Sequence, residues 1–483
     1  MSLKQRTISG LSWNFTGNFV DKAIAFVIGI ILARLLTPRE YGLVGMVSIF
    51  IILTQPFVNS GFSQALIRKK KCTQTDFSTI FYFNFFAGVL LYAILFCVAP
   101  YISNFFDEPQ LTTITRAIGL IIILEAASLI QITILTREVN FKIQTKIKII
   151  ASLVSGIVGI FLAYKGYGVW SLVFKKIVSS TLTSSMLWIN NKWKPQLVFS
   201  FSVIKELFGF SSKLLISGII DKVYYNIYNL VIAKYFSAKE LGLYTRAQNF
   251  KDLGAQQISE IISTVAFPVL SSIQDEPNRL KDNYIKIMTA TMFVVFSLMF
   301  VLCAVSESLV LTLIGEKWAE SIIYLQLLSL VGIYYPMYTL TRSLLYVFGK
   351  SGLNLKLQIL TKTLAIPTIL VGINFGIEYM IIAMIITGLL DFFVKAYYSG
   401  KLIGYSIINL LKDLTPSFFL SISVGACLFV IQALLKTSPI ITLLAQGFTG
   451  AVLLIGLSEL FRIREYLFIK EIISDRLSKI KKK

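Results

Sequence analysis

Stretches of about 20 predominantly apolar residues, the length of a membrane-spanning helix, recur along nearly the whole chain. This recurrence limits the possible folds more than any other feature of the sequence. Of the 483 residues, 55% are hydrophobic and only 15% are charged, whereas a soluble domain carries about 25% charged residues. A soluble enzyme is therefore excluded, and the sequence predicts an all-α polytopic membrane protein.

The apolar stretches predict about 14 transmembrane helices. The candidate spans are roughly 11–36, 41–66, 77–100, 111–135, 147–164, 167–189, 207–235, 241–270, 285–311, 319–347, 352–375, 377–400, 412–435 and 439–461. They leave no room for a soluble domain. The first stretch is not expected to be a cleavable signal peptide, because Asp21 and Lys22 interrupt its apolar run.

Basic residues are distributed unevenly between the connections. Lys and Arg outnumber Asp and Glu by 46 to 25. The run from Arg68 to Lys71 and the segment 462–483 follow even-numbered spans, whereas connections after odd-numbered spans hold few basic residues. By the positive-inside rule, both termini are expected in the cytoplasm. The same rule accounts for the positive charge without a nucleic-acid partner.

The sequence repeats itself at an offset of 200 residues. This offset aligns Asp21-Lys22 with Asp221-Lys222, and it aligns Glu40 and Gly42 with Glu240 and Gly242. Apolar matches between spans arise easily by chance, whereas a charged pair at the same position within two spans does not. We interpret the match as an internal repeat.

The repeat carries span 1 onto span 7, and an even displacement preserves the orientation of a span in the membrane. It therefore predicts two parallel six-helix lobes around a central cleft, as in alternating-access transporters. The N-terminal lobe is expected at 1–200 and the C-terminal lobe at 201–405. Two additional C-terminal helices are expected in 406–461, followed by a basic cytoplasmic tail, 462–483.

Polar residues form continuous faces on spans 1, 7 and 8. The face of span 8 comprises Thr245, Asn249, Asp252, Gln256, Ser259 and Ser263, at helical spacing. A charged side chain at mid-bilayer costs about 2.5–3.5 kcal/mol on insertion scales, so such faces turn towards protein or water. One interpretation is polar packing between helices. The alternative, which the length of the faces favours, is a water-lined cleft.

Cations outnumber carboxylates within the predicted spans. Because Lys and Arg donate charge-assisted hydrogen bonds to phosphate, this balance favours an anionic passenger. Tyrosines in spans 7 and 10, which could instead be ordinary core aromatics, offer ring faces and hydroxyls to a sugar. The expected substrate-binding residues are Lys22, Lys222, Arg246, Lys251, Arg342, Arg116, Tyr224, Tyr225, Tyr228, Asn249 and Gln256. The candidates for ion coupling or gating are Asp21, Asp221, Asp252, Glu260 and Glu125.

Nothing in the sequence points to catalysis. The chain has no histidine, which is the commonest acid–base group and metal ligand at neutral pH. Its four cysteines are scattered, and no GxxxxGK[ST] loop occurs. The sequence predicts a transporter that is not an enzyme, with no cofactor or metal and with H⁺ or Na⁺ as the candidate coupling ion.

Eight segments carry a resemblance to a known family. In chain order they are LARLLTPREYGL (32–43), GFSQALIRK (61–69), TDFST (75–79), APYISNFFDEPQL (99–111), LTREVNF (135–141), GVWSLV (168–173), LGLYTRAQN (241–249) and FPVLSSIQ (267–274). Through them the chain resembles the polysaccharide-export (Wzx-type) lipid-linked oligosaccharide flippases of the multidrug/oligosaccharidyl-lipid/polysaccharide (MOP) superfamily. The resemblance covers most of residues 1–400 and is strongest to members serving O-antigen, capsule, colanic or teichuronic acid export.

The resemblance implies a bacterial cytoplasmic (inner) membrane protein that moves a polyprenyl-pyrophosphate-linked oligosaccharide to the outer leaflet by alternating access. It further implies that cavity cations hold the pyrophosphate, and that a polysaccharide polymerase and a chain-length regulator are partners.

Three alternatives remain at this stage. An ion-coupled multidrug efflux antiporter of the same fold would need a cleft dominated by carboxylates. A membrane-embedded polymerase or glycosyltransferase would need a large outward loop. A passive scaffold or channel is the third.

Overall fold

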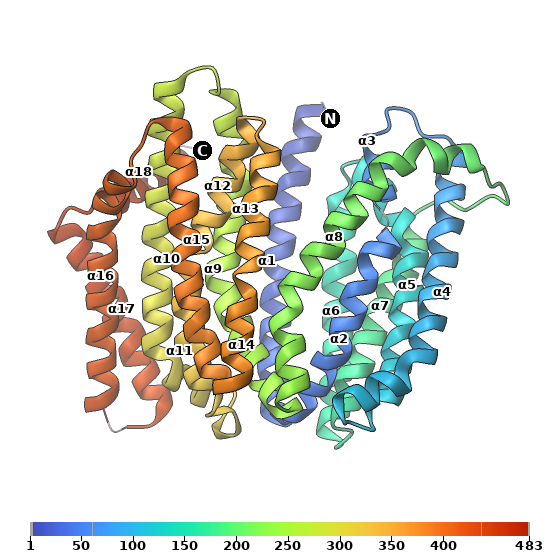
Figure 1. The fold of residues 1–483 in the computed structure, drawn as a ribbon, viewed down its shortest axis with the longest axis horizontal. Helices are drawn as coiled ribbons and strands as arrows, with labels where there is room; N and C mark the ends of the chain where they lie inside the picture. Colours follow the sequence, from blue (N-terminus) through green and yellow to red (C-terminus); the bar gives the residue numbers. More distant parts are fainter. Residues whose placement is uncertain (1–2, 60, 436, 482–483) are drawn as a thin grey trace. The chain divides into compact units, whose positions relative to one another are not determined.

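The computed structural model describes residues 3–59, 61–435 and 437–481, and helices account for most of them. The described ranges contain no strand, which confirms the predicted all-α class. The chain forms two compact units, Met1–Gly242 and Leu243–Lys483. We call them the N-terminal unit and the C-terminal unit (Figure 1). The lobe boundaries expected from the sequence stay a prediction.

The described residues of the N-terminal unit form eight helices and the start of a ninth. They are α1 (Leu3–Leu35), α2 (Pro38–Asn59), α3 (Phe62–Arg68), α4 (Gln74–Phe106), α5 (Leu111–Arg137), α6 (Phe141–Tyr164), α7 (Val169–Asn190), α8 (Phe201–Tyr235) and α9 (Ala238–Ser272). Within this unit α5 contacts α2, α3, α4, α6 and α7.

In the C-terminal unit, the part of the chain that the structure describes forms the rest of α9, nine further α-helices and one short 3₁₀ helix. They are α10 (Pro277–Leu313), η1 (Glu316–Trp318), α11 (Ser321–Gly332), α12 (Tyr335–Val347), α13 (Ser351–Thr363), α14 (Ala365–Phe375), α15 (Ile377–Ile403), α16 (Ile407–Leu434), α17 (Pro439–Leu460) and α18 (Arg464–Lys481). The central helix is α10, which contacts α11, α12, α15, α16, α17 and α18. Its Met292, Phe296 and Phe300 are buried in the core of the unit.

Ten helical stretches among the described residues are long and apolar enough to cross a membrane. Three of them join neighbouring helices: α2 with α3, α11 with α12, and α13 with α14. The other seven are α4, α5, α6, α10, α15, α16 and α17. Helices α1, α7, α8 and α9, at the predicted spans 1, 6, 7 and 8, are 22–35 residues long but are not among the ten. The polytopic character is therefore confirmed, while the number fourteen stays a prediction.

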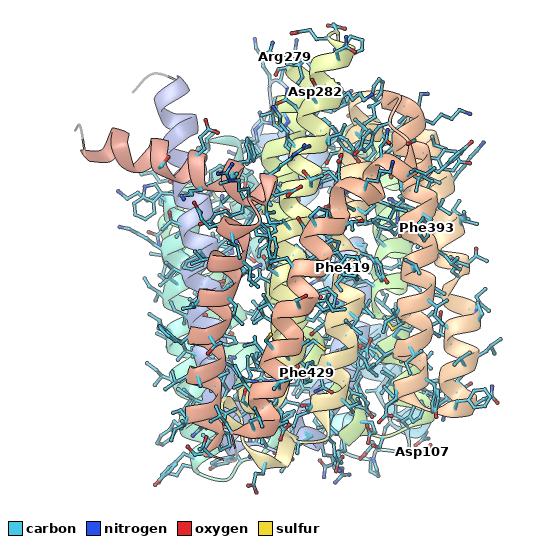
Figure 2. All side chains as sticks on the ribbon, turned by 90° about the vertical axis from the view of Figure 1, so that its left-hand side faces the viewer. Asp107, Arg279, Asp282, Phe393, Phe419 and Phe429 are labelled. Atoms are coloured by element: carbon cyan, nitrogen blue, oxygen red, sulfur yellow. The ribbon has the colours of Figure 1, made fainter. Side chains whose placement is uncertain are left out.

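Large apolar side chains project from the outer surface of the C-terminal unit. Phe393, Phe419 and Phe429 are 37%, 61% and 42% exposed, whereas Arg279 and Asp282 lie beyond them at one end of α10 (Figure 2). An apolar surface of this kind is a liability in water but is covered by lipid in a bilayer. The protein is thus a multi-pass membrane protein.

Two of the membrane-length stretches in the C-terminal unit are interrupted. Helix α11 ends at Gly332 and α12 begins at Tyr335, with Pro336 in its first turn. Helix α13 ends at Thr363 and α14 begins at Ala365, with Pro367 in its first turn. Proline lacks a backbone N–H and therefore favours the start of a helix over its interior. Interrupted helices often line binding sites in transporters.

The internal repeat gives α2 and α9 equivalent N-terminal caps. Thr37 Oγ1 accepts a hydrogen bond from the backbone N–H of Glu40 over 3.4 Å. Two hundred residues later, Ser237 Oγ accepts from the N–H of Glu240 over 3.1 Å. A Ser or Thr at this position satisfies an N–H that the first helical turn leaves without a backbone partner.

The two copies of the repeat contact each other through their glycines. A Cβ added at Gly42 would lie 1.6 Å from the carbonyl oxygen of Ala238, and one added at Gly242 would lie 1.9 Å from that of Pro38. The contact is reciprocal, because adding 200 to the residue numbers of one half gives the other. Only glycine lets the backbones approach this closely. All four residues belong to the N-terminal unit.

Candidate functional site

An aromatic and ionic cluster lies in the C-terminal unit, beside the interruption between α11 and α12. The Tyr335 hydroxyl donates a hydrogen bond to Glu260 Oε1 of α9 over 3.1 Å. The rings of Tyr335 and Tyr338 lie 5.9 Å apart. One turn further along α12, the guanidinium carbon of Arg342 lies 5.4 Å from the centre of the Tyr338 ring.

Helix α15 supplies a second cation to the same ring. Lys395 is 4% exposed, and its Nζ lies 4.6 Å from the centre of the Tyr338 ring. It forms an ion pair with Asp391, one turn earlier on the same helix. Asp391 Oδ1 also accepts a hydrogen bond from Thr361 Oγ1 over 2.6 Å. We call Glu260, Tyr335, Tyr338, Arg342, Asp391 and Lys395 the tyrosine cluster.

The tyrosine cluster places two cations against one aromatic ring within membrane-length helices. Each cation–π contact stabilises by about 0.5–2 kcal/mol, depending on its desolvation. Lys395 is buried and bound to Asp391, whereas Arg342 is only half-buried. The planar guanidinium of Arg342 suits bidentate contact with phosphate. Tyrosine rings and hydroxyls suit a sugar, so the cluster has the chemistry to bind an anionic glycan-bearing ligand.

A second polar cluster lies among α2, α5 and α7 of the N-terminal unit. Lys176 Nζ donates a hydrogen bond to Ser48 Oγ over 2.6 Å. Glu125 of α5 hydrogen-bonds with Gln55 of α2 and interacts electrostatically with Lys176. These three helices contact one another. The structure thus joins polar residues that the sequence distributes over spans 2, 4 and 6, and Glu125 belongs to this group.

The aligned charged pairs of the repeat lie near the middle of α1 and α8. Lys22, Asp221 and Lys222 are exposed, and Asp21 is half-buried. Because a charge that faces lipid is costly, we expect these charges to face water or protein in a bilayer. On α8, Tyr224 and Tyr228 are half-buried and Tyr225 is exposed.

Arg116 lies apart from these groups, at the contact between α4 and α5. Its guanidinium stacks over the Phe96 ring, 4.2 Å from the centre, and its Nε donates a hydrogen bond to the Phe96 carbonyl over 3.3 Å. The structure does not bring Arg116 together with Glu125, which lies nine residues later on the same helix.

The remaining predicted residues lie along α9. Lys251 Nζ and Asp252 Oδ1 form an ion pair of 2.6 Å, with side chains 12% and 18% exposed. The Arg246 guanidinium lies over the rings of Phe250 and Trp318, at 5.6 and 5.9 Å. Asn249 is exposed and Gln256 is half-buried. The structure therefore pairs Lys251 with Asp252, and it places Glu260 and Arg342 in one cluster.

Of the tyrosine cluster, the expected site residues left out Tyr335, Tyr338, Asp391 and Lys395. Only Lys395 was not singled out at all. Its signal was present, because Asp391 and Lys395 are opposite charges four residues apart within an apolar stretch. Such spacing places both groups on one face of a helix, where they pair.

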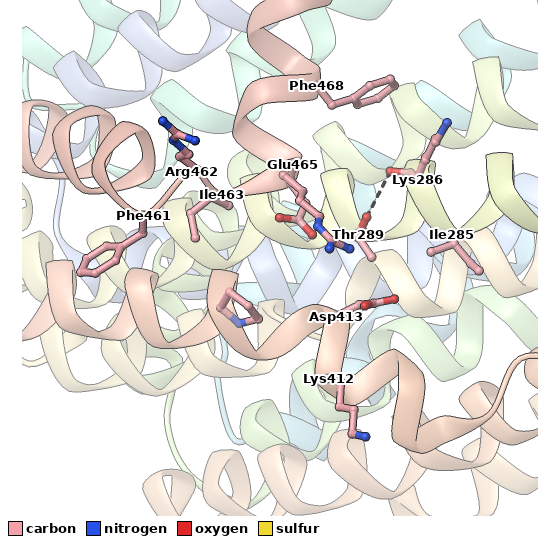
Figure 3. Close-up of a pocket in the computed structure, with 12 residues that line it drawn as sticks. Ile285, Lys286, Thr289, Lys412, Asp413, Phe461, Arg462, Ile463, Glu465 and Phe468 are labelled. Atoms are coloured by element: carbon pink, nitrogen blue, oxygen red, sulfur yellow. Dashed lines mark hydrogen bonds between the residues drawn. The ribbon is translucent and has the colours of Figure 1, made fainter.

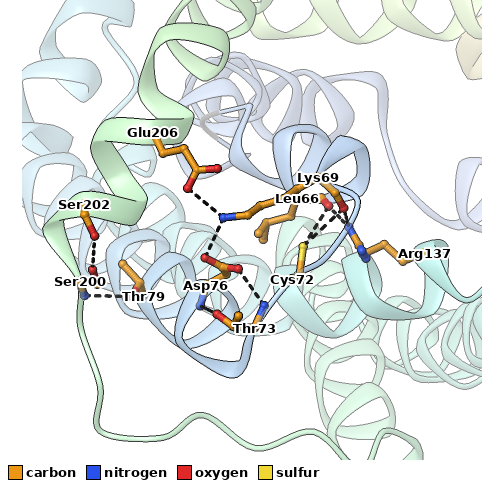
Figure 4. A network of polar contacts seen from close by, with 10 residues as sticks. All are labelled: Leu66, Lys69, Cys72, Thr73, Asp76, Thr79, Arg137, Ser200, Ser202 and Glu206. Carbon is orange, nitrogen blue, oxygen red and sulfur yellow. Dashed lines mark hydrogen bonds and ion pairs between the residues drawn. The ribbon is translucent and has the colours of Figure 1, made fainter.

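Six of the eight segments that carry the family resemblance meet at two places in the N-terminal unit. At the end of α3, Lys69 Nζ lies 3.2 Å from Asp76 Oδ1 and 2.9 Å from Glu206 Oε2 (Figure 4). Asp76 and Thr73 form a capping box at the start of α4. Arg137 donates a hydrogen bond to the Lys69 carbonyl over 2.8 Å. This network joins the segments 61–69, 75–79 and 135–141.

The second meeting place lies at the start of α2. Arg39 Nη2 and Glu108 Oε2 form an ion pair of 2.8 Å. A Cβ added at Gly168, whose φ is +54°, would lie 2.4 Å from Glu40 Oε1. The segments 32–43, 99–111 and 168–173 thus come together. The motifs are mainly structural, because they fasten helix ends.

Replacing Lys69 by glutamine is expected to lower the free energy of unfolding by about 1–3 kcal/mol, because Asp76 then stays buried without its cation. Thermal unfolding of the purified protein is the measurement. Lys70→Gln, at the exposed neighbouring position, is the control and should change little. If both variants lower the melting temperature equally, the Lys69 network does not stabilise the protein.

The Lys69 network also predicts a dependence on pH. The hydrogen bond to Glu206 raises the pKa of the Lys69 ammonium above its ordinary value of 10.5, and the contact with Asp76 adds to the shift. Folding therefore favours the protonated form, so the stabilisation is complete below the ordinary pKa and is lost as the pH rises through the raised one. The difference in melting temperature between wild type and Lys69→Gln should shrink above pH 10.5.

Replacing Lys395 by methionine is expected to destabilise the protein by about 3–5 kcal/mol, because it leaves the Asp391 carboxylate inside the unit without its partner. The double variant Lys395→Met/Asp391→Asn should recover most of that loss, since neither buried charge remains. Thermal unfolding of both variants measures the difference. Equal destabilisation in the single and double variants would argue against the ion pair.

The sequence and the fold are both similar to those of known proteins. Residues 31–323 match a family described as "Polysaccharide biosynthesis protein". The chain belongs to this family. The lipopolysaccharide biosynthesis protein WzxC of Escherichia coli (strain K12) is 23% identical over 448 residues, which cover 90% of this chain and 89% of WzxC. The resemblance to the polysaccharide-export proteins is thus confirmed.

Solved structures share the fold of this polysaccharide biosynthesis protein. The lipid II flippase MurJ in an inward closed conformation superposes with a TM-score of 0.75 and 17% identity, over 93% of this chain and 98% of MurJ. An inward-facing multidrug resistance MATE transporter of the MOP superfamily gives a TM-score of 0.64 and 14% identity, over 82% of this chain and 98% of that one. Both likenesses concern the fold alone, and they confirm the MOP architecture.

Proposed function

We propose that the protein is an alternating-access flippase, which carries a polyprenyl-pyrophosphate-linked oligosaccharide from the cytoplasmic to the outer leaflet of a bacterial cytoplasmic membrane. Membership of the polysaccharide biosynthesis family supports a role in glycan export. The observation that carries the proposal is the tyrosine cluster, in which Arg342 and Lys395 lie 5.4 and 4.6 Å from the centre of the Tyr338 ring, within stretches long and apolar enough to cross a membrane. The guanidinium of Arg342 and the tyrosine rings of this cluster have the chemistry to bind a negatively charged glycan carrier, while the Lys395–Asp391 pair also stabilises the fold.

In this proposal, different residues bind the pyrophosphate and the sugars of the substrate. Arg342 and the exposed lysines Lys22 and Lys222 neutralise the pyrophosphate through charge-assisted hydrogen bonds. Tyrosines of α8 and α12 contact the sugars, while the polyprenyl tail stays in lipid. The two parallel lobes of the repeat, 1–200 and 201–405, alternately open to the two sides of the membrane.

Coupling is proposed to use H⁺ or Na⁺, with carboxylates as the ion-binding groups. Asp252 already pairs with Lys251, and Glu260 accepts from Tyr335. Asp21 and Asp221 stand beside the lysines proposed to bind substrate. When substrate is absent, these carboxylates neutralise the cations. When substrate binds, they are released to take up the coupling ion.

The proposal describes a transporter, without a catalytic step. A polysaccharide polymerase and a chain-length regulator are its proposed partners, and both termini are placed in the cytoplasm on the basis of the basic connections. A multidrug efflux antiporter is the competing function. It would carry cations, whereas Lys and Arg outnumber carboxylates within the predicted spans.

The experiment follows a fluorescent undecaprenyl-pyrophosphate oligosaccharide in proteoliposomes, with and without an imposed H⁺ or Na⁺ gradient. Protein-dependent movement that responds to one gradient is expected, and it should fall in Arg342→Ala. The matched control is Lys350→Ala, at an exposed position eight residues later, between α12 and α13. Efflux of a cationic dye without movement of the lipid would favour the antiporter.

A further inference from the structure

A basic cavity lies in the C-terminal unit, outside the tyrosine cluster. It has a volume of about 570 Å³, and it is bounded by the start of α10, the start of α16 and the turn between α17 and α18 (Figure 3). This volume falls within the range of small-molecule sites, about 300–1,000 Å³. Nothing in the proposed transport cycle uses this cavity.

The cavity collects cations from three parts of the chain. Lys286 comes from α10, Lys412 from α16, and Arg462 and Arg464 from the turn and the start of α18. All four side chains are exposed. Figure 3 shows Lys286, Lys412 and Arg462 on three different sides of the lining residues, with their charged ends pointing outward. Among the described residues, none of the four forms an ion pair with a carboxylate.

Two carboxylates also line the cavity, and each has a partner of its own. Asp413 accepts a hydrogen bond from the Tyr405 hydroxyl. Glu465 is buried, and it accepts a hydrogen bond from Ser417 Oγ over 3.3 Å. Burial raises the pKa of Glu465, so this carboxylate takes up a proton more readily than an exposed one. The cations therefore dominate the charge that a ligand meets.

Hydrogen bonds and an ion pair hold the turn between α17 and α18, which lines the cavity. The Ile463 N–H bonds to the Ser458 carbonyl over 3.0 Å, and the Arg462 N–H bonds to the Glu459 carbonyl over 3.2 Å. Arg462 takes a left-handed conformation with φ +46°, as is usual for the residue that ends a helix in this way. Lys470 Nζ pairs with Glu459 Oε1 over 2.8 Å and so ties α18 to α17.

The position of the cavity identifies the kind of ligand. It lies where α17, a membrane-length helix, ends, so its rim is at the edge of the bilayer. Large apolar side chains project beside it: Phe419, Leu460 and Phe461 are 61%, 73% and 66% exposed. A ligand held here presents a negative group to the cations and apolar chains to these residues.

We propose that this cavity, which we call the basic cavity, binds the phosphate of an anionic phospholipid from the leaflet at the end of α17. Lys286, Lys412, Arg462 and Arg464 line the cavity, and their flexible side chains supply the charge that the phosphate would meet. The acyl chains lie along α16 and α17. The bound lipid would fasten the two additional helices and α18 to α10. This proposal does not depend on the transported substrate.

Native mass spectrometry of the purified full chain tests the proposal with two lipids of equal acyl chains, dioleoyl-phosphatidylglycerol and dioleoyl-phosphatidylcholine. The anionic lipid is expected to bind at least about tenfold more tightly, because two or more charge-assisted hydrogen bonds distinguish it. Lys286→Gln/Lys412→Gln should remove most of that preference. Arg464→Gln, tested separately, should weaken it as well.

The control variant is Lys350→Gln/Lys356→Gln, which removes two exposed lysines elsewhere in the C-terminal unit. It should keep the preference for the anionic lipid. Equal binding of the two lipids, or equal loss in the control, would overturn the proposal. If inorganic phosphate alone displaces the lipid, the ligand of the basic cavity is a soluble anion. Preferential binding of undecaprenyl pyrophosphate would assign the cavity to the transported lipid.

Discussion

Replacing Lys222 by alanine is expected to slow flipping by about 100-fold or more while shifting the melting temperature by no more than about 2 °C. Lys222 is exposed near the middle of α8, so its removal exposes no core and breaks no buried ion pair. Exposed substitutions of this kind change the free energy of unfolding by about 0.5 kcal/mol or less. A loss of transport without a loss of stability would separate a substrate contact from a structural role.

The size of the effect follows from the charge of the pyrophosphate. A hydrogen bond to a charged group contributes about 1.5–3 kcal/mol, and an ammonium can donate more than one to adjacent phosphate oxygens. Losing about 3 kcal/mol in the occluded state is about a hundredfold in rate. Lys222→Arg should retain a substantial part of the activity, because the charge remains.

Lys205 offers a matched control on the same helix. It is exposed like Lys222 but lies 17 residues earlier, close to the start of α8. At 1.5 Å per residue, the two positions are about 25 Å apart along the helix axis. Lys205→Ala should therefore leave flipping in the proteoliposome assay nearly unchanged. If it slows flipping as much as Lys222→Ala, the effect is one of overall charge, and the binding role is wrong.

The helical architecture could be predicted from sequence because apolar runs near 20 residues have few alternatives in a bilayer. The paired glycines illustrate what the repeat adds. Gly42 and Gly242 were visible as an aligned pair, but their close contacts with the backbone of the other copy could not be predicted. A repeat specifies equivalent positions, whereas a contact between them depends on how the copies pack.

The candidate site was harder to predict than the fold. Arg342 and Glu260 were expected from their unusual place in apolar stretches. The contact of Tyr335 with Glu260 and that of Tyr338 with Arg342 depend on the interruption between α11 and α12. That interruption lies inside a stretch predicted as one continuous span, 319–347. Pro336 marks the break, but proline is tolerated within membrane helices, and its presence alone does not fix where a helix restarts.

Replacing Gly42 by alanine is expected to destabilise the protein by about 3 kcal/mol and to abolish flipping, because the added Cβ overlaps backbone that no rotamer change can move. The contact atom is the Ala238 carbonyl oxygen, so α2 and the start of α9 must separate. Gly242→Ala should have the same effect through the Pro38 carbonyl. Thermal unfolding and the flipping assay measure the two consequences.

The double variant Gly42→Ala/Gly242→Ala distinguishes a shared contact from two independent ones. If both glycines serve one contact, the first alanine already separates the helices, and the second adds little. The double variant should then be no more than about 1 kcal/mol less stable than either single variant. Gly209→Ala is the control, because a Cβ on this exposed helical glycine meets nothing within 4 Å and should be neutral or slightly stabilising. If the two alanines lower the free energy of unfolding additively, each glycine acts alone. The reciprocal contact would then not stabilise the protein as one unit.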